Sequence, residues 1–287
     1  MVSPAAASWR TPNRLGLSAG EAWWFDTRCT QKALETRRQA ATATVVIDSR
    51  FNGFPDIALG GYVGGILARG RARAEVTLRR PVKLGKPYLI VTGPDESRTL
   101  QEGSDVFAIA QDAYVGLEVP QPVGLDASVV ATEGYVGHRK HLVPTCFNCG
   151  PMRPEGDGLR IFPGSVVGRD LVAAPWTPSP SLADSDGSVK SEFIWSSLDC
   201  PTIWALVLQG QPDTEERAVT ARLAVELISP VMAGQPHIVM GWKAGESGRT
   251  RIAGGAIYST DGRLLAKARH TLVMTDWGVP MGLNRWQ

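Results

Sequence analysis

Two stretches of the chain share one order of hydrophobic patterns. In the first, residues 43–51 alternate polar and apolar positions and are rich in β-branched residues, which predicts a strand. A polar loop and a helix beginning at Gly60 follow. Residues 74–93 then predict two strands around a turn at 83–86, and residues 105–115 predict a further strand.

The second stretch repeats this order. Residues 170–176 predict a strand, and residues 192–209 predict a helix with Pro201 near its middle. Residues 221–242 again read as strand, turn and strand. Residues 250–276 predict a last hairpin, with the turn residues Ser-Thr-Asp-Gly between its strands.

An internal repeat links the two stretches. Four residues recur at a single offset: Pro81, Val82, Gly85 and Pro87 in the first, and Pro230, Val231, Gly234 and Pro236 in the second. A hairpin turn that needs glycine and a strand edge that tolerates proline explain the match. We therefore expect two copies of one α+β unit, each a helix wrapped by an antiparallel sheet.

The repeat sets the expected boundaries. They are an N-terminal extension at 1–42, a first repeat at 43–118, a linker with a C-x-x-C motif at 119–165 and a second repeat at 166–287. Prolines and glycines break every long pattern in the linker. The extension carries Trp9, Trp23 and Trp24, and such aromatics favour an interface. We expect a homo-oligomer, most simply a dimer.

Composition narrows the function classes. Of 287 residues, 43% are hydrophobic and 20% are charged, which is typical of a globular protein with a sizeable core. The formal net charge is only +2, without a long basic run, so nucleic acid is not an expected partner. No apolar stretch is long enough to span a bilayer, and the first residues lack the pattern of a secretory signal. Four cysteines do not make a disulfide framework in a chain of this length, so we expect a cytoplasmic protein.

Gly60 and Gly61 stand where the first helix begins. The first amides of a helix have no partner within it and carry the positive end of its dipole, so they can hold a carbonyl oxygen or a phosphate. Gly64, Gly65 and Ala68 require that something pack closely against this helix, and the flanking strands are the expected partner. The alternative is a glycine-rich turn before an ordinary core helix.

The linker holds a second signal. His138, His141, Cys146 and Cys149 follow the order H-x2-H-x4-C-x2-C, and two histidines with two cysteines satisfy a tetrahedral zinc ion. The alternative is a pair of reduced cysteines packed as small apolar residues. No metal is assigned to a reaction site and no cofactor is expected. The chain lacks a Gly-x-Ser-x-Gly elbow, a Gly-x-Gly-x-x-Gly loop and a Walker loop.

Several segments resemble a known family. The motif FNG…GGYVGGILA resembles the helix entry of thioesterase-superfamily proteins. The segments CFNCGP…GDGLRIFPG and LADSDGSVKSEFIWSSLDCP resemble an actinobacterial-type branch of double-hotdog proteins. The resemblance covers about residues 43–275 and implies a tandem hotdog fold. It also implies an acyl-thioester hydrolase acting on acyl-CoA or carrier-bound acyl groups.

The resemblance also implies site residues. In double-hotdog thioesterases a helix Asp, a Ser or Thr and a late-strand Gln orient the attacking water, and these positions match Asp199, Thr220 and His270. The histidine departs from the family pattern and can itself act as a base. The first-copy counterpart of His270 is either Asp112 or Gln111, depending on the register.

Thioester hydrolysis needs an activated water and donors for the developing oxyanion. Asp199 lies between Leu198 and Cys200, and partial desolvation there would raise its pKa. Gly60 and Gly61 are the candidate donors. Tyr62 is either a lining residue of the acyl channel or a packed tyrosine. Two other functions stay open: a non-catalytic acyl-thioester binder or scaffold, and a hotdog dehydratase or hydratase.

Overall fold

The computed structural model describes residues 42–209, 217–275 and 279–280. Trp9, Trp23 and Trp24 lie outside these residues, as does the predicted extension apart from Thr42. The dimer expected from the tryptophans therefore stays a prediction. The described residues belong to one compact unit, residues 40–287.

The first half of the chain supplies five strands to a large sheet. They are β1 (Thr42–Val46), β4 (Arg73–Leu78), β5 (Pro87–Thr92), β6 (Arg98–Glu102) and β7 (Asp105–Gln111). Their order in the sheet is β1-β5-β6-β7-β4. A separate small hairpin, β2 (Asn52–Phe54) with β3 (Ile57–Ala58), precedes the first helix.

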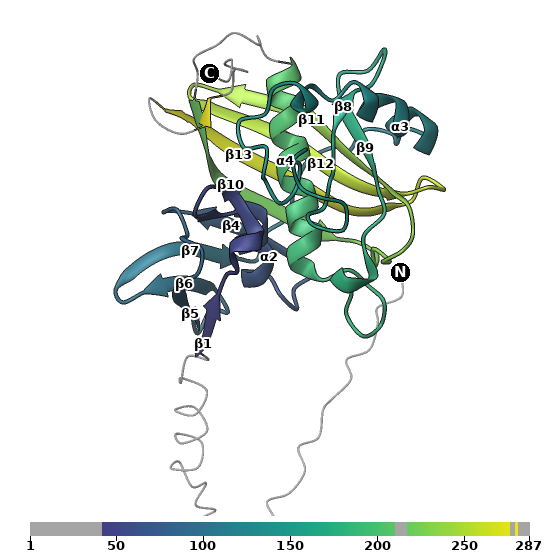
Figure 1. The fold of residues 1–287 in the computed structure, drawn as a ribbon. Helices are drawn as coiled ribbons and strands as arrows, with labels where there is room; N and C mark the ends of the chain where they lie inside the picture. The colour runs from purple at the N-terminus through teal and green to yellow at the C-terminus, as the bar shows by residue number, and fades with distance from the viewer. Residues whose placement is uncertain (1–41, 210–216, 276–278, 281–287) are drawn as a thin grey trace, which may run out of the picture. The chain divides into compact units, whose positions relative to one another are not determined.

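The second half extends the same sheet. Its strands are β8 (Gly164–Ser165), β9 (Val172–Trp176), β10 (Arg217–Leu227), β11 (His237–Ser247), β12 (Thr250–Ser259), β13 (Leu264–Thr275) and β14 (Val279–Pro280). The order runs on from β4 as β10-β13-β12-β11-β9-β8, with β14 pairing β10. All pairings among the described strands are antiparallel, and β4 and β10 join the two halves edge to edge (Figure 1).

The two predicted hairpin turns form in the same way. Gly85 and Gly234 both adopt a positive φ, +71° and +75°, which a residue with a side chain rarely adopts. The Gly85 amide donates to the carbonyl of Ile47 at 2.8 Å, and the Gly234 amide donates to that of Pro178 at the same distance. The repeated glycines therefore form the same kind of turn in both halves.

Two helices pack against each other. The glycine-bearing face of α2 (Gly60–Leu67) contacts α4 (Ser191–Gln209), not the flanking strands as the sequence led us to expect. A Cβ on Gly61 would lie 2.6 Å from the carbonyl oxygen of Trp195, and one on Gly64 would lie 2.6 Å from the Trp195 ring. Small residues on α2 let the bulkier α4 approach its backbone.

The linker contains short elements and buried side chains. It contains α3 (Leu125–Glu133) and a short 3₁₀ turn, η2 (Val136–His138). Phe147 and Ile161 are fully buried in it. Residues of α3 and β9 share a small core with Ile238 and Met240 of β11, and α4 lies on one face of the second-half strands (Figure 1).

Other local differences have simple causes. The strand expected to reach Phe51 ends at Val46, because the Asp48 side chain caps the 3₁₀ turn η1 (Ser49–Phe51) by accepting from the Arg50 amide at 2.8 Å. A second such turn, η3 (Pro180–Leu182), precedes α4. Strand β6 was not expected, since its sequence, RTLQE, has only one fully buried position.

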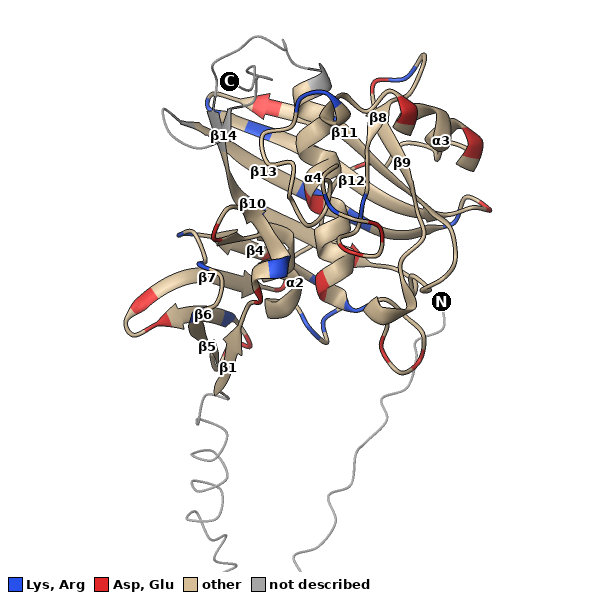
Figure 2. Cartoon of the chain, viewed as in Figure 1, with Lys and Arg blue, Asp and Glu red and all other residues tan. Residues whose placement is uncertain are grey.

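One main hydrophobic cluster runs through both halves, from Ile47 to Met274, because the two helices meet between them. In the view of Figure 2, acidic and basic residues are interspersed along turns and strand ends. None of the helices in the described residues has the length and apolar character to cross a membrane.

Candidate functional site

A buried carboxylate marks the start of α2. Asp199 of α4 is 2% exposed, and its Oδ2 accepts a hydrogen bond of 2.6 Å from the Gly61 amide. A Cβ on Gly61 would lie 2.9 Å from the Cβ of Asp199. Glycine is therefore required for the carboxylate to reach the first helical amides.

The environment changes the acidity of this carboxylate. Burial raises the pKa of Asp199 to about 7, the Gly61 hydrogen bond opposes the rise, and negative charge at Cys146 adds to it. The sequence predicted the direction of this shift from the apolar neighbours of Asp199. No cation neutralises this carboxylate in the hydrogen bonds and ion pairs of the described residues.

His270 of β13 is bonded at both ring nitrogens. Its Nδ1 lies 2.7 Å from the Thr202 hydroxyl oxygen, and its Nε2 lies 3.0 Å from that of Thr220. The Thr202 hydroxyl donates its hydrogen to the backbone carbonyl of Asp199, so it accepts from Nδ1–H. The remaining nitrogen, Nε2, then accepts from Thr220.

Burial keeps this imidazole neutral. It lowers the pKa of His270 to about 4, only partly opposed by the backbone carbonyl of Asp199. The Nδ1 atom lies 3.8 Å from Oδ1 of Asp199, which is close but longer than a hydrogen bond. At neutral pH, His270 therefore orients its neighbours through a fixed tautomer.

A bulge in β10 brings Thr220 to this cluster. Leu223 pairs with His270, but the register shifts between Thr220 and Arg222, so that Thr220 pairs with Leu272. Without the extra residue, Thr220 would pair with Val273, and its side chain would lie on the opposite face. Thr220 is less buried than Asp199 or His270.

The structure thus brings together Asp199, Thr220 and His270 at the start of α2. A Cβ on Gly60 would lie 3.5 Å from Oδ2 of Asp199 and 4.0 Å from Cγ2 of Thr220. The Gly61 amide, expected to face a substrate oxygen, instead donates to Asp199.

Tyr62 belongs to a packed aromatic group. Its ring stacks on Phe51 with centroids 4.0 Å apart and also contacts Phe147 and Phe193. Burial, reinforced by the charge of Glu192, raises the pKa of its hydroxyl to about 12. Of the two interpretations of Tyr62 from the sequence, the packed tyrosine fits these contacts.

The ladder registers also bear on the counterpart of His270. Ala110 pairs with Val76 in the first half, and Ala268 pairs with Val225 in the second. Val76 and Val225 stand at the offset of the repeated prolines, which aligns His270 with Asp112. Asp112 makes an exposed ion pair of 3.0 Å with Arg73.

Solved structures resemble the whole described unit. The tesB protein of Mycobacterium avium subspecies paratuberculosis matches with a TM-score of 0.52 and 10% identity, covering 85% of this chain and 99% of that one. A conserved hot dog fold protein from Alicyclobacillus acidocaldarius matches with a TM-score of 0.51 and 13% identity, over 85% and 98% of the two chains. This chain has the hotdog fold.

A third hotdog match is a provisionally assigned thioesterase from Novosphingobium aromaticivorans, with a TM-score of 0.51 and 10% identity over 82% of this chain and 96% of that one. No family model and no curated protein matches the chain. At these identities the likeness establishes the hotdog fold and leaves the chemistry to the residues.

Sequence reasoning missed one member of the cluster. Thr202 joins His270 to the backbone of Asp199, and it follows Asp199 by three residues on the same helix. That spacing puts both residues on one face of α4 and is the signal that could have found it.

The opposite end of the contact between α2 and α4 holds a different carboxylate. Glu192, near the start of α4, is 4% exposed and accepts two bonds from the Arg69 guanidinium: Nη2 to Oε1 at 2.5 Å and Nε to Oε2 at 3.2 Å. At this end of the α2–α4 contact, the carboxylate is therefore bound in an ion pair with two hydrogen bonds.

Of the four predicted zinc ligands, Cys146, Cys149 and His141 lie together, but His138 does not join them. His138 is exposed, with its ring against Tyr135 and Phe162. The sulfurs of Cys146 and Cys149 lie instead with that of Cys200, which the sequence did not suggest.

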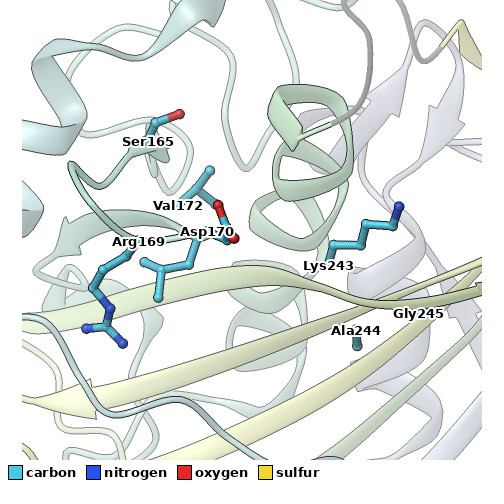
Figure 3. Close-up of a pocket in the computed structure, with 8 residues that line it drawn as sticks. Ser165, Arg169, Asp170, Val172, Lys243, Ala244 and Gly245 are labelled. Carbon is cyan, nitrogen blue, oxygen red and sulfur yellow. The ribbon is translucent and has the colours of Figure 1, made fainter.

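A surface cleft of about 690 Å³ is lined by residues of the second half (Figure 3). It is lined by the turn between β8 and β9, including Arg169 and Asp170, and by residues around Lys243 of β11. It contains none of the candidate site residues.

Proposed function

We propose that this chain hydrolyses acyl thioesters, presented by coenzyme A or an acyl carrier, with Asp199 as the group that activates water. One observation carries the proposal: a buried carboxylate, which has no cationic partner in the described part of the chain, is held by the Gly61 amide beside the bonded pair of Thr220 and His270. A carboxylate whose pKa is raised by burial suits general base catalysis near neutral pH.

In the proposed reaction, Asp199 takes a proton from a water molecule whose oxygen attacks the thioester carbonyl carbon. The tetrahedral intermediate collapses by breaking the carbon–sulfur bond. The proton on Asp199 passes to the departing thiolate, so the products are a carboxylic acid and a free thiol. No external oxidant or cofactor is needed to balance this step.

Thr220 and His270 orient the water in this scheme. Because the Thr220 hydroxyl donates to Nε2 of His270, its oxygen lone pairs remain to accept from water. His270 is in turn held by Thr202. A nucleophile held by two oriented groups starts close to its reactive geometry, which lowers the entropic part of the barrier.

The oxyanion is assigned to the start of α2. Gly61 is already bonded to Asp199, which leaves the Gly60 amide as the remaining donor of the predicted pair. The positive end of the helix dipole adds to the stabilisation of negative charge there.

We also infer that the chain consists of two tandem hotdog units. Both halves use one strand order, β1-β5-β6-β7-β4 and β9-β11-β12-β13-β10. Equivalent backbone bonds support the alignment before each helix: Leu59 N–H to Phe51 at 2.9 Å, and Lys190 N–H to Leu182 at 3.0 Å. The alignment makes Glu192 the counterpart of Gly61, and Asp199 that of Ala68.

The test is turnover of a panel of acyl-CoAs of different chain length, read out as release of free thiol. We expect at least one substrate to be hydrolysed by the purified full chain. Binding of acyl-CoA without thiol release would contradict the proposal and favour the binder. Mass spectrometry after rapid quenching should detect no acyl group on Thr220, because the proposed nucleophile is water.

A further inference from the structure

Three cysteine sulfurs meet between the linker and α4, and His141 lies beside one of them. The sulfurs of Cys146, Cys149 and Cys200 all lie within 4.8 Å of one another. Nε2 of His141 lies 3.3 Å from the Cys149 sulfur. All four side chains are buried, with at most 6% of any residue exposed.

We propose that Cys146, Cys149, Cys200 and His141 bind one structural zinc ion. Tetrahedral zinc with sulfur ligands at about 2.3 Å sets a sulfur–sulfur separation of about 3.8 Å, by simple tetrahedral geometry. The sulfurs of Cys146 and Cys200 are 3.8 Å apart. A disulfide would need about 2.05 Å, so the spacing matches joint ligation of an ion.

The remaining contacts suit a thiolate ligand set. The Trp204 indole N–H points at the Cys149 sulfur at 3.5 Å, which is the kind of donor that supports a metal-bound thiolate. Three sulfurs and one nitrogen favour zinc among the common divalent ions. Full burial leaves no open coordination position, so the site is structural and supplies no reactive water.

His141 has to change one contact to bind. The Val143 amide donates to its Nδ1 at 3.0 Å, which puts the ring proton on Nε2. Ligation through Nε2 requires that proton on Nδ1, so the Val143 bond is given up. We therefore expect His141 to contribute less to zinc affinity than any of the three cysteines.

The site would fasten the linker beside the proposed reaction centre. Cys200 follows Asp199 directly on α4, whereas Cys146 and Cys149 belong to the loop that crosses the helix. In that loop, Asn148 donates from Nδ2 to the Ser196 carbonyl. A zinc ion that joins this loop to α4 would keep the Asp199 carboxylate in place beside the Gly61 amide.

The experiment uses the full chain, expressed with zinc in the medium and purified under reducing conditions without chelator. Elemental analysis should find about one zinc per chain. Cobalt(II) replacement should give the visible absorption of tetrahedral thiolate coordination. Cys200→Ser and Cys146→Ser should lose the metal, and His141→Ala should retain it at lower affinity.

Cys29→Ser is the matched control, since Cys29 lies outside the described residues and is not among the proposed ligands. It should leave the zinc content unchanged. If Cys29→Ser lost the metal and His141→Ala kept full affinity, the assignment of His141 would be overturned.

The proposed site would be overturned if the protein held no zinc after incubation with excess zinc chloride. It would also be overturned if the protein contained iron and sulfide instead of zinc. If a serine variant does not fold, X-ray absorption of the wild type decides by counting three sulfurs and one nitrogen. These readouts are independent of thioester hydrolysis, so the two proposals fail separately.

Discussion

The two ends of the α2–α4 contact each bury a carboxylate, but they surround it differently. At one end, Asp199 accepts one backbone bond, from Gly61, and lies beside the neutral ring of His270. At the other, Glu192 accepts from two nitrogens on one edge of the Arg69 guanidinium, Nε and Nη2. Among the residues that the structure describes, the first carboxylate has no compensating cation, whereas the second has one.

This difference distinguishes the carboxylate of the proposed reaction, Asp199, from the carboxylate of an ion pair, Glu192. The guanidinium beside Glu192 compensates the charge of its carboxylate and binds both of its oxygens. Burial without a cation favours the protonated form and brings the pKa of Asp199 to about 7. If the two halves are tandem units, the two ends of this contact are related and have diverged, because Asp199 stands at the position of Ala68 and Glu192 at that of Gly61.

The largest expected effect comes from removing the base at the Asp199 end. Asp199→Asn keeps an acceptor for the Gly61 amide, so we expect an unchanged fold and a similar KM. The turnover rate should fall by ~10²–10⁴-fold, the usual contribution of a positioned general base. Steady-state kinetics measures the turnover rate and KM, and thermal unfolding tests whether the fold is unchanged. Full activity would redirect the search to Asp112 and Gln111.

A pH effect should follow from the buried imidazole of His270. Between about pH 4 and 6.5 the unfolded chain binds a proton at this histidine and the folded chain does not, so folded stability rises with pH. The contribution amounts to about 3 kcal/mol over that window. The test compares the wild type with His270→Gln. Asp199 is present in both proteins, so its own titration largely cancels in this comparison.

Denaturant unfolding of the wild type and His270→Gln at several pH values measures the contribution of His270 to the free energy of unfolding. The wild type should gain stability over His270→Gln as the pH rises from 4 to 6.5 and gain no more above it. A constant difference, or one that shrinks with rising pH, would mean that the folded histidine is protonated.

Replacing His270 should lower activity less than replacing Asp199, since it orients the water without taking its proton. We expect a loss of roughly 10–100-fold for His270→Ala, which is smaller than the ~10²–10⁴-fold that a group taking the proton itself contributes. His270→Gln should recover part of it, because an amide can bond Thr202 and Thr220 together. Equal losses in the two variants would argue against an orienting role.

The smallest effect is expected at the Glu192 end. Arg69→Met leaves a buried carboxylate unpaired, which should lower the free energy of unfolding by roughly 1–2 kcal/mol. Fully buried pairs cost ~3–5 kcal/mol to break, but the Arg69 side chain is 55% exposed and screened by water. Lys86→Met, which removes an exposed pair with Glu102, is the control and should change stability by less than about 0.5 kcal/mol.

Local pattern was enough to predict the turns and the helix starts. Gly85 and Gly234 have the positive φ that their repeated spacing implied, and α2 begins at Gly60. The partner of α2 was not predictable in this way. Its glycine face indicates close packing but not which element supplies it, and α4 lies more than 120 residues farther along the chain.

The details of the cluster depend on contacts that no local pattern carries. The bulge that turns Thr220 toward His270 arises from the pairing of β10 with β13. Cys200 joins Cys146 only because the linker folds onto α4. The prolines and glycines of the linker predicted that it lacks long elements, but not that Phe147 and Ile161 bury it against the core.

The most direct test compares the two carboxylates in a single assay. Asp199→Asn and Glu192→Gln each replace a buried carboxylate by its amide, and both are measured with the best acyl-CoA substrate of the wild type. The account predicts that kcat of Glu192→Gln exceeds that of Asp199→Asn by ~100-fold or more. Equal losses in the two variants, or a larger loss at Glu192, would contradict the assignment of the reaction to the Asp199 end.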